Sequence, residues 1–147
     1  MIAIGADHGG YEMKEQIKSY LLEKGIEVKD FGTYSNDSVD YPDYAVYVCK
    51  SIQSKESDLG ILICGTGEGI GIAANKHKGI RCAICSETFS AKMARVHNDA
   101  NVIAFGARVI GIETAKEIVD AFLSNEFEGD RHIRRVSKIT EIEQGER

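Results

Sequence analysis

The chain has 147 residues, of which 43% are hydrophobic and 28% charged, and its formal net charge at pH 7 is −5. A chain of this length buries about 70% of its unfolded surface as one domain, so we expect a single domain over residues 1–147. The negative balance argues against a nucleic-acid partner, and the lack of a signal-peptide pattern or a membrane-length apolar run argues for a cytoplasmic protein without a membrane partner.

The first part of the chain alternates strand-like and helix-like patterns. Residues 2–6 form an apolar run that ends in a polar loop, and residues 11–24 carry apolar side chains at helical spacing. Residues 26–31 alternate in polarity, which predicts a second strand near an edge of the sheet. The only proline, Pro42, favours a helix start before the apolar positions of residues 44–52.

The same alternation continues to the C-terminus. The remaining predicted elements are strands at 59–64, 80–85 and 101–106 and helices after the central glycines, at 88–96, at 114–123 and, beyond a linker at 125–130, at 131–143. Five strands that alternate with helices predict an α/β fold. We expect a Rossmann-like three-layer αβα sandwich with a five-stranded parallel sheet, plus a C-terminal helix.

The stretch from Leu59 to Lys76 joins a buried strand, a glycine-rich loop and a helix start. Glycine occupies every second position from Gly65 to Gly71, and Cys64 is the last strand residue before them. Loop amides and a helix N-terminus together make an anion site. The spacing fits neither the dinucleotide fingerprint nor the phosphate loop of nucleotide hydrolases, and a tight structural turn is the alternative interpretation.

Polar residues follow several of the predicted strands where those strands end. Asp7 and His8 follow the first strand, Cys64 ends the third and Arg108 follows the fifth. Ligands bind outside the carboxyl ends of parallel strands, so we expect these four residues to gather along one edge. Cys64 is either a core thiol or a base or nucleophile whose thiolate the loop amides favour.

Three further residues have both a structural and a functional interpretation. His97, at a predicted helix C-terminus, is either a cation stabilised by the helix dipole or a proton-transfer group. Arg131 and Arg135 stand four apart on one helix face, with Arg134 to the side. They make either a solvated charged face or a guanidinium clamp for phosphate, which Arg108 could join.

The four cysteines are expected to be reduced thiols. Cys82 and Cys85 have a CxxC spacing, which can indicate a metal or redox site. They fall within one predicted strand, and residues three apart on a strand face opposite sides of the sheet. We therefore expect no shared metal and no disulfide there.

Taken together, the motifs resemble those of the type B ribose-5-phosphate isomerase family, which also includes isomerases of hexose phosphates. The resemblance covers essentially the whole chain and rests on Gly5-Ala6-Asp7-His8-Gly9-Gly10, Asp40-Tyr41-Pro42, Ile63-Cys64-Gly65-Thr66-Gly67, Ala73-Ala74-Asn75-Lys76, His97-Asn98-Asp99, Ala104-Phe105-Gly106-Ala107-Arg108, and Gly129-Asp130-Arg131-His132 with Arg135. It implies interconversion of ribose 5-phosphate and ribulose 5-phosphate through a cis-enediolate, without metal or cofactor. It also implies homodimers or homotetramers with active sites at the subunit interface.

The resemblance assigns roles to individual residues. Cys64 matches the proton-abstracting base, His97 the ring-opening residue, and Thr66 a catalytic helper. The implied substrate-binding residues are Asp7, His8, Tyr41, Gly65, Thr66, Gly67, Glu68, Gly69, Asn98, Arg108, Arg131 and Arg135. Ile70 occupies the position of the glutamate used by a branch without the cysteine, so this chain resembles the cysteine branch. Glu68 departs from the pattern, because a carboxylate there would repel phosphate unless it points outward or is paired.

Two alternative functions stay open at this stage. The first keeps the chemistry but takes a hexose 6-phosphate, allose or galactose, because pocket depth cannot be read from a sequence. The second is a non-catalytic module that binds a sugar phosphate or a nucleotide. Side-by-side rates on the three sugars separate the first alternative, and tight ATP or NAD binding would support the second.

Overall fold

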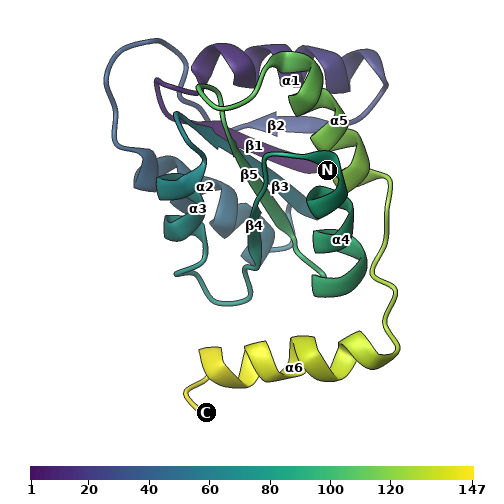
Figure 1. Ribbon diagram of the computed structural model, residues 1–147. Coiled ribbons are helices and arrows are strands. Elements are labelled where there is room, and N and C mark those ends of the chain that lie inside the picture. Colours follow the sequence, from purple (N-terminus) through teal and green to yellow (C-terminus); the bar gives the residue numbers. More distant parts are fainter.

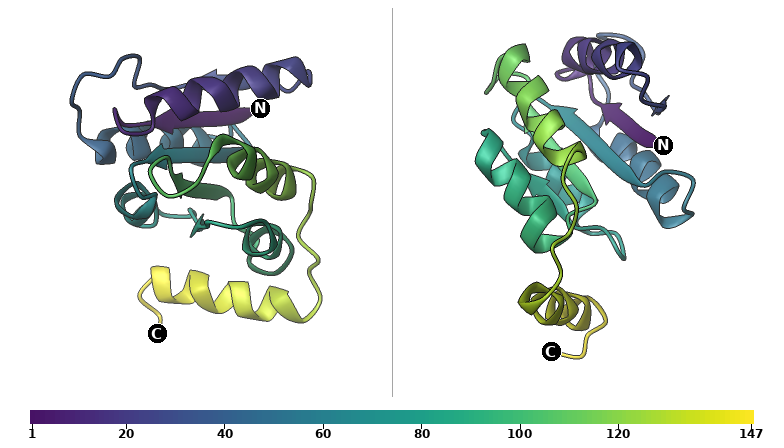
Figure 2. Two further views of the ribbon diagram at one scale, coloured as in Figure 1. Left: turned by 45° about the horizontal axis from the view of Figure 1, so that its top comes forward. Right: turned by 90° about the vertical axis from the view of Figure 1, so that its right-hand side faces the viewer.

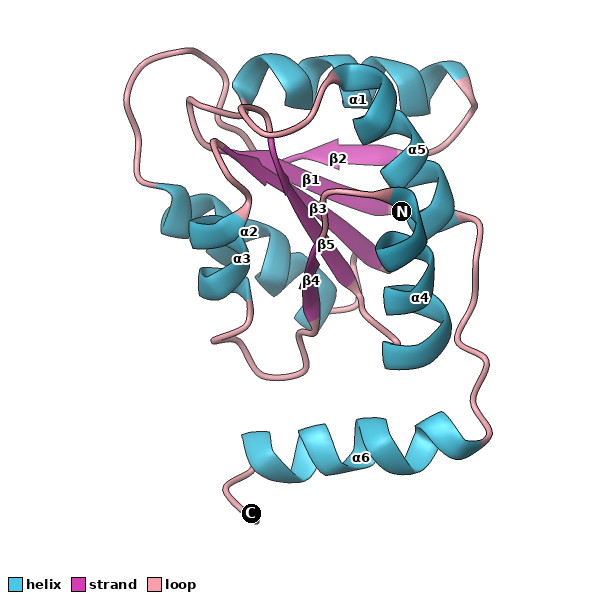
Figure 3. Ribbon diagram, in the orientation of Figure 1, coloured by secondary structure: helices cyan, strands magenta, loops and turns pink.

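The computed structural model describes residues 1–147 and contains a five-stranded parallel sheet with helices on both faces (Figure 1, Figure 3). The strands are β1 Ile2–Ala6, β2 Val28–Asp30, β3 Leu59–Cys64, β4 Cys82–Ile84 and β5 Val102–Gly106. The helices are α1 Tyr11–Glu23, α2 Tyr41–Gln53, α3 Glu68–Ala74, α4 Thr88–Asn98, α5 Ile112–Leu123 and α6 Arg131–Glu143. The strand order is β2-β1-β3-β5-β4, and every pair is parallel. The predicted three-layer α/β fold is confirmed.

The alternation of side chains along the central strands divides the core into two layers. Along β3, Ile61 and Ile63 pack with buried residues of α1, α4 and α5. Leu62 and Cys64 pack on the opposite face with residues of α2 and α3. This period of two places the Cys64 side chain on the face covered by α3, the helix that begins directly after the glycine loop.

The edge strands are shorter than the sequence pattern suggested. Residues 26–31 and 80–85 were each expected to be strands, whereas β2 and β4 have three residues each. Each of them pairs with a single neighbour, β1 or β5, so ladder pairing limits their length. The expected edge position of β2 is confirmed. Helix α2 starts at Tyr41, and its first turn includes Pro42, whose missing N–H costs nothing there, so the predicted helix start at the proline is confirmed.

The cysteines lie as the strand alternation predicted. Cys82 packs against the α2 and α3 layer, whereas Cys85 belongs to the other core layer. All four cysteines are free thiols. Burial raises the pKa of Cys49 to about 12 and that of Cys85 to about 11, so both stay protonated near neutral pH.

Helix α6 stands apart from the sandwich, at the end of an extended linker (Figure 2). It approaches the C-terminal end of α4 and leaves Ile133 and Ile142 exposed. A cavity of about 500 Å³ lies between α6 and the edge of the sheet, lined by residues that include Ile80, Cys82 and Ile139. No helix of the chain is both long and apolar enough to cross a membrane.

Candidate functional site

Cys64 ends β3 beneath the glycine loop. Its side chain is 4% exposed, and its Sγ accepts a hydrogen bond from the Gly67 amide at 3.1 Å. Gly67 has a φ of 81°, and a Cβ there would lie 2.7 Å from backbone atoms of Phe105. Only glycine allows this loop to pack so closely on β5 while its amide points at the thiol.

The loop side chains around Cys64 face solvent. Thr66 Oγ1 accepts a hydrogen bond from the Glu68 amide at 3.2 Å, and both side chains are exposed. Glu68 lies in the first turn of α3, where a carboxylate interacts favourably with the helix dipole. Both residues line a cavity of about 300 Å³ at the ends of β4 and β5. The ring of Tyr41 covers Gly69, since a Cβ at position 69 would lie 2.7 Å from it.

Three more candidate residues lie at the same edge of the sheet. Asp7 Oδ1 accepts a hydrogen bond from the Gly10 amide at 3.1 Å. His8 Nδ1 accepts one from the Val39 amide at 3.1 Å, so the neutral ring carries its proton on Nε2. Arg108 lies against Gly65, because a Cβ at position 65 would be 3.3 Å from Arg108 Nη1. The expectation that Asp7, His8, Cys64 and Arg108 gather along one edge is confirmed in their placement.

His97 and Asn98 lie at the opposite end of the sheet. They end α4, which runs back from the carboxyl end of β4 to the start of β5 (Figure 1). Cys64 pairs with Gly106 at the far end of β5, and four residue steps along that strand span about 13 Å. Cys64 and His97, two of the three predicted catalytic residues, are therefore separated within one chain by the length of the sheet.

The arginines of α6 are also at this opposite end. The His132 ring, in the first turn of α6, stacks on the His97 ring with a centroid distance of 4.2 Å. Arg131 and Arg135 flank His132 and are exposed. The clamp in which Arg108 joins Arg131 and Arg135 is thus not formed within one chain, because α6 lies away from the carboxyl edge (Figure 2).

Two arginines fix the backbone just after Asn98. Asp99 has a φ of 47°, in the left-handed region, and ends α4. Arg81 donates to the Asp99 carbonyl at 2.8 Å and to its carboxylate at 3.1 Å. Arg95 Nη1 donates to the other carboxylate oxygen at 3.1 Å and to the Ala100 carbonyl at 2.6 Å. These hydrogen bonds hold the C-terminal end of α4, the turn that carries His97 and Asn98, in a fixed position.

His132 and Glu128 lie against His97 but were not among the site residues predicted from the sequence. His132 is 6% exposed, and burial together with the charges of His97, Arg131 and Arg135 lowers its pKa. Glu128 Oε2 lies 3.8 Å from His97 Nε2. The available sequence signal was weak: His132 is one of only four histidines and stands beside two of the candidate arginines.

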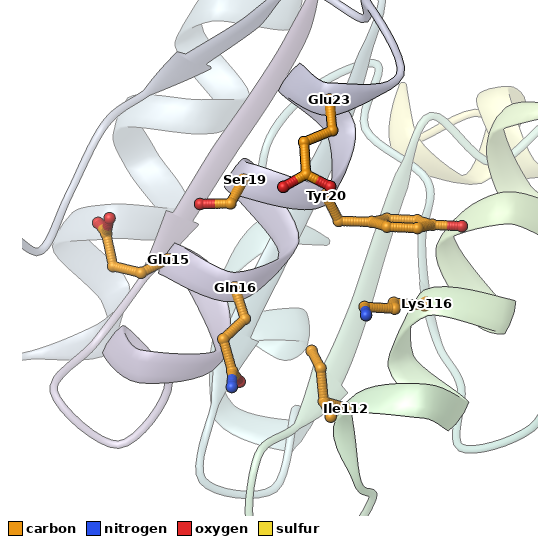
Figure 4. Close-up of a pocket in the computed structure, with 7 residues that line it drawn as sticks. All are labelled: Glu15, Gln16, Ser19, Tyr20, Glu23, Ile112 and Lys116. Carbon is orange, nitrogen blue, oxygen red and sulfur yellow. The ribbon is translucent and has the colours of Figure 1, made fainter.

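A separate groove lies between α1 and α5 and contains none of the candidate residues (Figure 4). Its volume is about 410 Å³, and it is lined by Glu15, Gln16, Ser19, Tyr20, Glu23, Ile112 and Lys116. Lys116 Nζ lies 5.2 Å from the centre of the Tyr20 ring, which fills one side of the groove. The candidate chemistry is elsewhere, at the two ends of the sheet.

The chain is similar to known sugar-phosphate isomerases over nearly its full length. Residues 2–139 match the family model described as ribose/galactose isomerase. The chain is 55% identical over 143 residues to ribose-5-phosphate isomerase B of Escherichia coli K12, covering 97% of this chain and 96% of that protein. It is 46% identical to the D-erythrulose-4-phosphate isomerase of Pectobacterium atrosepticum, covering 99% and 97%. The structure matches that of ribose-5-phosphate isomerase B of Clostridium thermocellum with a TM-score of 0.97 and 54% identity, covering 98% and 97%.

Proposed function

Because the chain belongs to the ribose/galactose isomerase family, we propose that it interconverts ribose 5-phosphate and ribulose 5-phosphate by proton transfer at Cys64. The chain is an isomerase of the ribose-5-phosphate type, as its identity to such enzymes over nearly its full length shows. The observation that best supports the role of Cys64 is the hydrogen bond from the Gly67 amide to its sulfur. The reaction proceeds without a metal or a cofactor.

Isomerisation moves one proton between two carbons. The Cys64 thiolate removes the proton from C2 of the open-chain aldose, and the C2–H electron pair forms the C1=C2 double bond. The carbonyl oxygen O1 becomes the enediolate oxygen, and a proton then passes from the C2 hydroxyl to O1, which moves the negative charge to O2. As the C2=O bond forms, the electron pair of the C1=C2 bond takes the proton back from the thiol onto C1, which gives the ketose. The Gly67 amide donates to the sulfur, and the amides of the loop from Gly65 to Gly69 are the donors for the developing oxyanion. Thr66 and Asp7 assist the proton transfers.

Ring opening and part of the substrate binding are carried out by residues of a second chain. The active site lies at the interface of a homodimer and combines Asp7, His8, Cys64 and Arg108 of one chain with the partner subunit's His97, Asn98, Arg131 and Arg135. The separation of about 13 Å along β5 between the two groups supports this arrangement, since one chain alone cannot join them. The exposed apolar side chains of α6, Ile133 and Ile142, support burial of that helix by another copy.

The phosphate is held by guanidinium groups and by His8. Arg131 and Arg135 project from one face of α6, and their forks match phosphate oxygens in pairs. Binding energy from this distant group holds C1 and C2 over the sulfur. His97 carries protons between ring and solvent to open the furanose, while Asn98 and Tyr41 contact the sugar hydroxyls.

Substrate choice is tested by initial rates with a chelator present. Ribose 5-phosphate, allose 6-phosphate, galactose 6-phosphate and erythrulose 4-phosphate are compared side by side at equal concentrations. The tetrose is included because a relative of 46% identity is named for it. We expect the pentose to have the highest kcat/KM and to keep it with the chelator. A higher value for another sugar would reassign the substrate, and loss of activity with chelator would contradict the metal-free mechanism.

A further inference from the structure

Three potential metal ligands converge where α4, the linker and α6 meet. They are His97 at the end of α4, Glu128 in the linker and His132 in the first turn of α6. One ligand atom from each lies within 4.8 Å of the others. The backbone holds this arrangement, because the Glu128 amide donates to the Val96 carbonyl at 3.0 Å. The cluster is therefore built by packing between elements and is more than a chance meeting of surface side chains.

One ring nitrogen of the cluster, Nε2 of His132, lacks a hydrogen-bond partner. His132 is 6% exposed, and its Nε2 is buried without a hydrogen-bond partner. Buried polar atoms in folded proteins almost always have a partner, so an orphaned ring nitrogen indicates a ligand. The His97 ring stacks on the His132 ring at a centroid distance of 4.2 Å, and one ligand atom of Glu128 lies within 4.8 Å of a ring nitrogen of each histidine. A cation that accepts a nitrogen lone pair would satisfy His132 Nε2.

The donor set selects the kind of cation. Two imidazole nitrogens and one carboxylate oxygen suit zinc and other late first-row metals, whereas magnesium and calcium prefer oxygen ligands alone. Ligands of tetrahedral zinc are about 3.4 Å apart. The two rings stack nearly parallel, so they must turn out of the stack for both nitrogen lone pairs to reach one ion. His97 and Glu128 are 35% and 44% exposed, which leaves a route for the ion and room for a water as fourth ligand. We propose that His97, Glu128 and His132 form a binding site for a zinc ion.

Zinc at this site would inhibit the enzyme. Capture of His97 removes the group that opens the furanose ring, so this consequence rests on the proposed function. The ion takes no part in the isomerisation itself. The enzyme should therefore work without a metal, lose activity reversibly when zinc binds, and regain that activity when a chelator removes the zinc.

The test separates binding from inhibition. Zinc is titrated calorimetrically into the full chain carrying Cys64→Ala, which removes the active-site thiol as a competing ligand. We expect one site per chain, weakened at least about 10-fold by His132→Asn and by Glu128→Gln, since even outer-shell changes cost that much. His77→Asn, which alters a histidine outside the cluster, is the matched control and leaves the affinity unchanged. Unchanged affinity in both cluster variants would overturn the proposal.

Cobalt(II) in place of zinc identifies the ligands directly. Binding at the cluster gives visible bands without a thiolate charge-transfer band in the chain that retains Cys64, whereas a thiolate band would assign the metal to a cysteine and overturn the proposal. Zinc inhibition of ribose 5-phosphate turnover is then measured in the chain with Cys64 and in Glu128→Gln. A matching loss of inhibition and affinity supports the inhibitory role. Binding without inhibition would instead contradict the role of His97 in ring opening.

Discussion

At the scale of single residues, the position of Cys64 depends on what surrounds it more than on the thiol itself. The sulfur is nearly enclosed, and the loop amide of Gly67 points at it. Cys49 and Cys85 are also buried, and burial is the main cause that raises the pKa of Cys49 to about 12 and that of Cys85 to about 11. The chain thus contains one thiol with a hydrogen-bond donor aimed at it from a glycine loop and others kept inert by the core.

Replacement of Cys64 by alanine tests its role as the base. We expect Cys64→Ala to lower kcat by about 10²–10⁴, the usual contribution of general base catalysis, with little change in KM. Cys85→Ala alters another free, buried cysteine and should keep nearly full kcat. Steady-state rates on ribose 5-phosphate decide the matter. Near-full turnover by Cys64→Ala would remove this residue from the mechanism.

The arginines of α6 allow a matched comparison on one helix. Arg135→Ala should raise KM for ribose 5-phosphate at least about 10-fold, because a charge-assisted bond to phosphate contributes about 1.5–3 kcal/mol. Arg134→Ala removes the same charge from a neighbouring exposed position and should change KM little. Equal effects of the two changes would indicate general charge attraction and would contradict a specific phosphate contact.

At the scale of elements, a buried ion pair ties the first helix to the edge of the sheet. Lys14 of α1 is fully buried, and its Nζ lies 2.6 Å from Asp30 at the end of β2. Lys18 lies 2.8 Å from the same carboxylate, and the Gly32 amide donates to its other oxygen at 2.9 Å. Although burial opposes it, hydrogen bonds from Lys14, Lys18 and Gly32 lower the pKa of Asp30.

This pair predicts how stability depends on pH. The folded pKa of Asp30 is below its unfolded value of about 3.9, so its contribution is present above pH 4 and is lost as pH falls through the folded pKa. Asp30→Asn should therefore reduce the free energy of unfolding by about 3 kcal/mol at pH 7, and by less at pH 3. Urea unfolding at one protein concentration measures both values. Glu113→Gln, in an exposed pair with Lys116, is the control with little change. A pH-independent deficit would contradict the role of the Asp30 charge.

Element types followed from the sequence, whereas some element ends did not. The run 59–64 is bounded by a polar residue and a glycine loop, and β3 covers the same residues. The apolar run 80–85 looks equally long, yet β4 has only three residues, which pair with Val102, Ile103 and Ala104 of β5. Periodicity reports which side chains are buried, and pairing between distant strands is invisible to it.

At the scale of the whole molecule, the candidate site is divided between two ends of one sheet. The part at the carboxyl ends of the strands was predictable, because parallel strands bring Asp7, Cys64 and Arg108 to one edge. The position of the residues on α4 and α6 could not be predicted from the carboxyl ends of the strands. A helix that returns antiparallel to the strands puts its last residue, Asn98, at the amino ends. The position of α6 depends on a linker whose path the sequence pattern does not encode.

Mixing two inactive variants tests the shared site. Cys64→Ala and His97→Asn each disable both sites of a homodimer if each site takes one residue from each chain. After mixing and exchange of subunits, half of the dimers are mixed, and each mixed dimer has one intact site. We expect about one quarter of normal activity to return. No recovery after verified subunit exchange would show that Cys64 and His97 do not act together across the interface.

The placement of Cys64 and His97 at opposite ends of β5 also has a consequence for catalysis in dilute solution. If neither chain holds a complete site, a single chain has no activity. The rate per chain then depends on the protein concentration, because the concentration sets the fraction of chains that are dimeric. Specific activity would then fall on dilution below the dissociation constant of the dimer and return with a lag as chains meet again. Newly synthesised chains would be inactive until they dimerise.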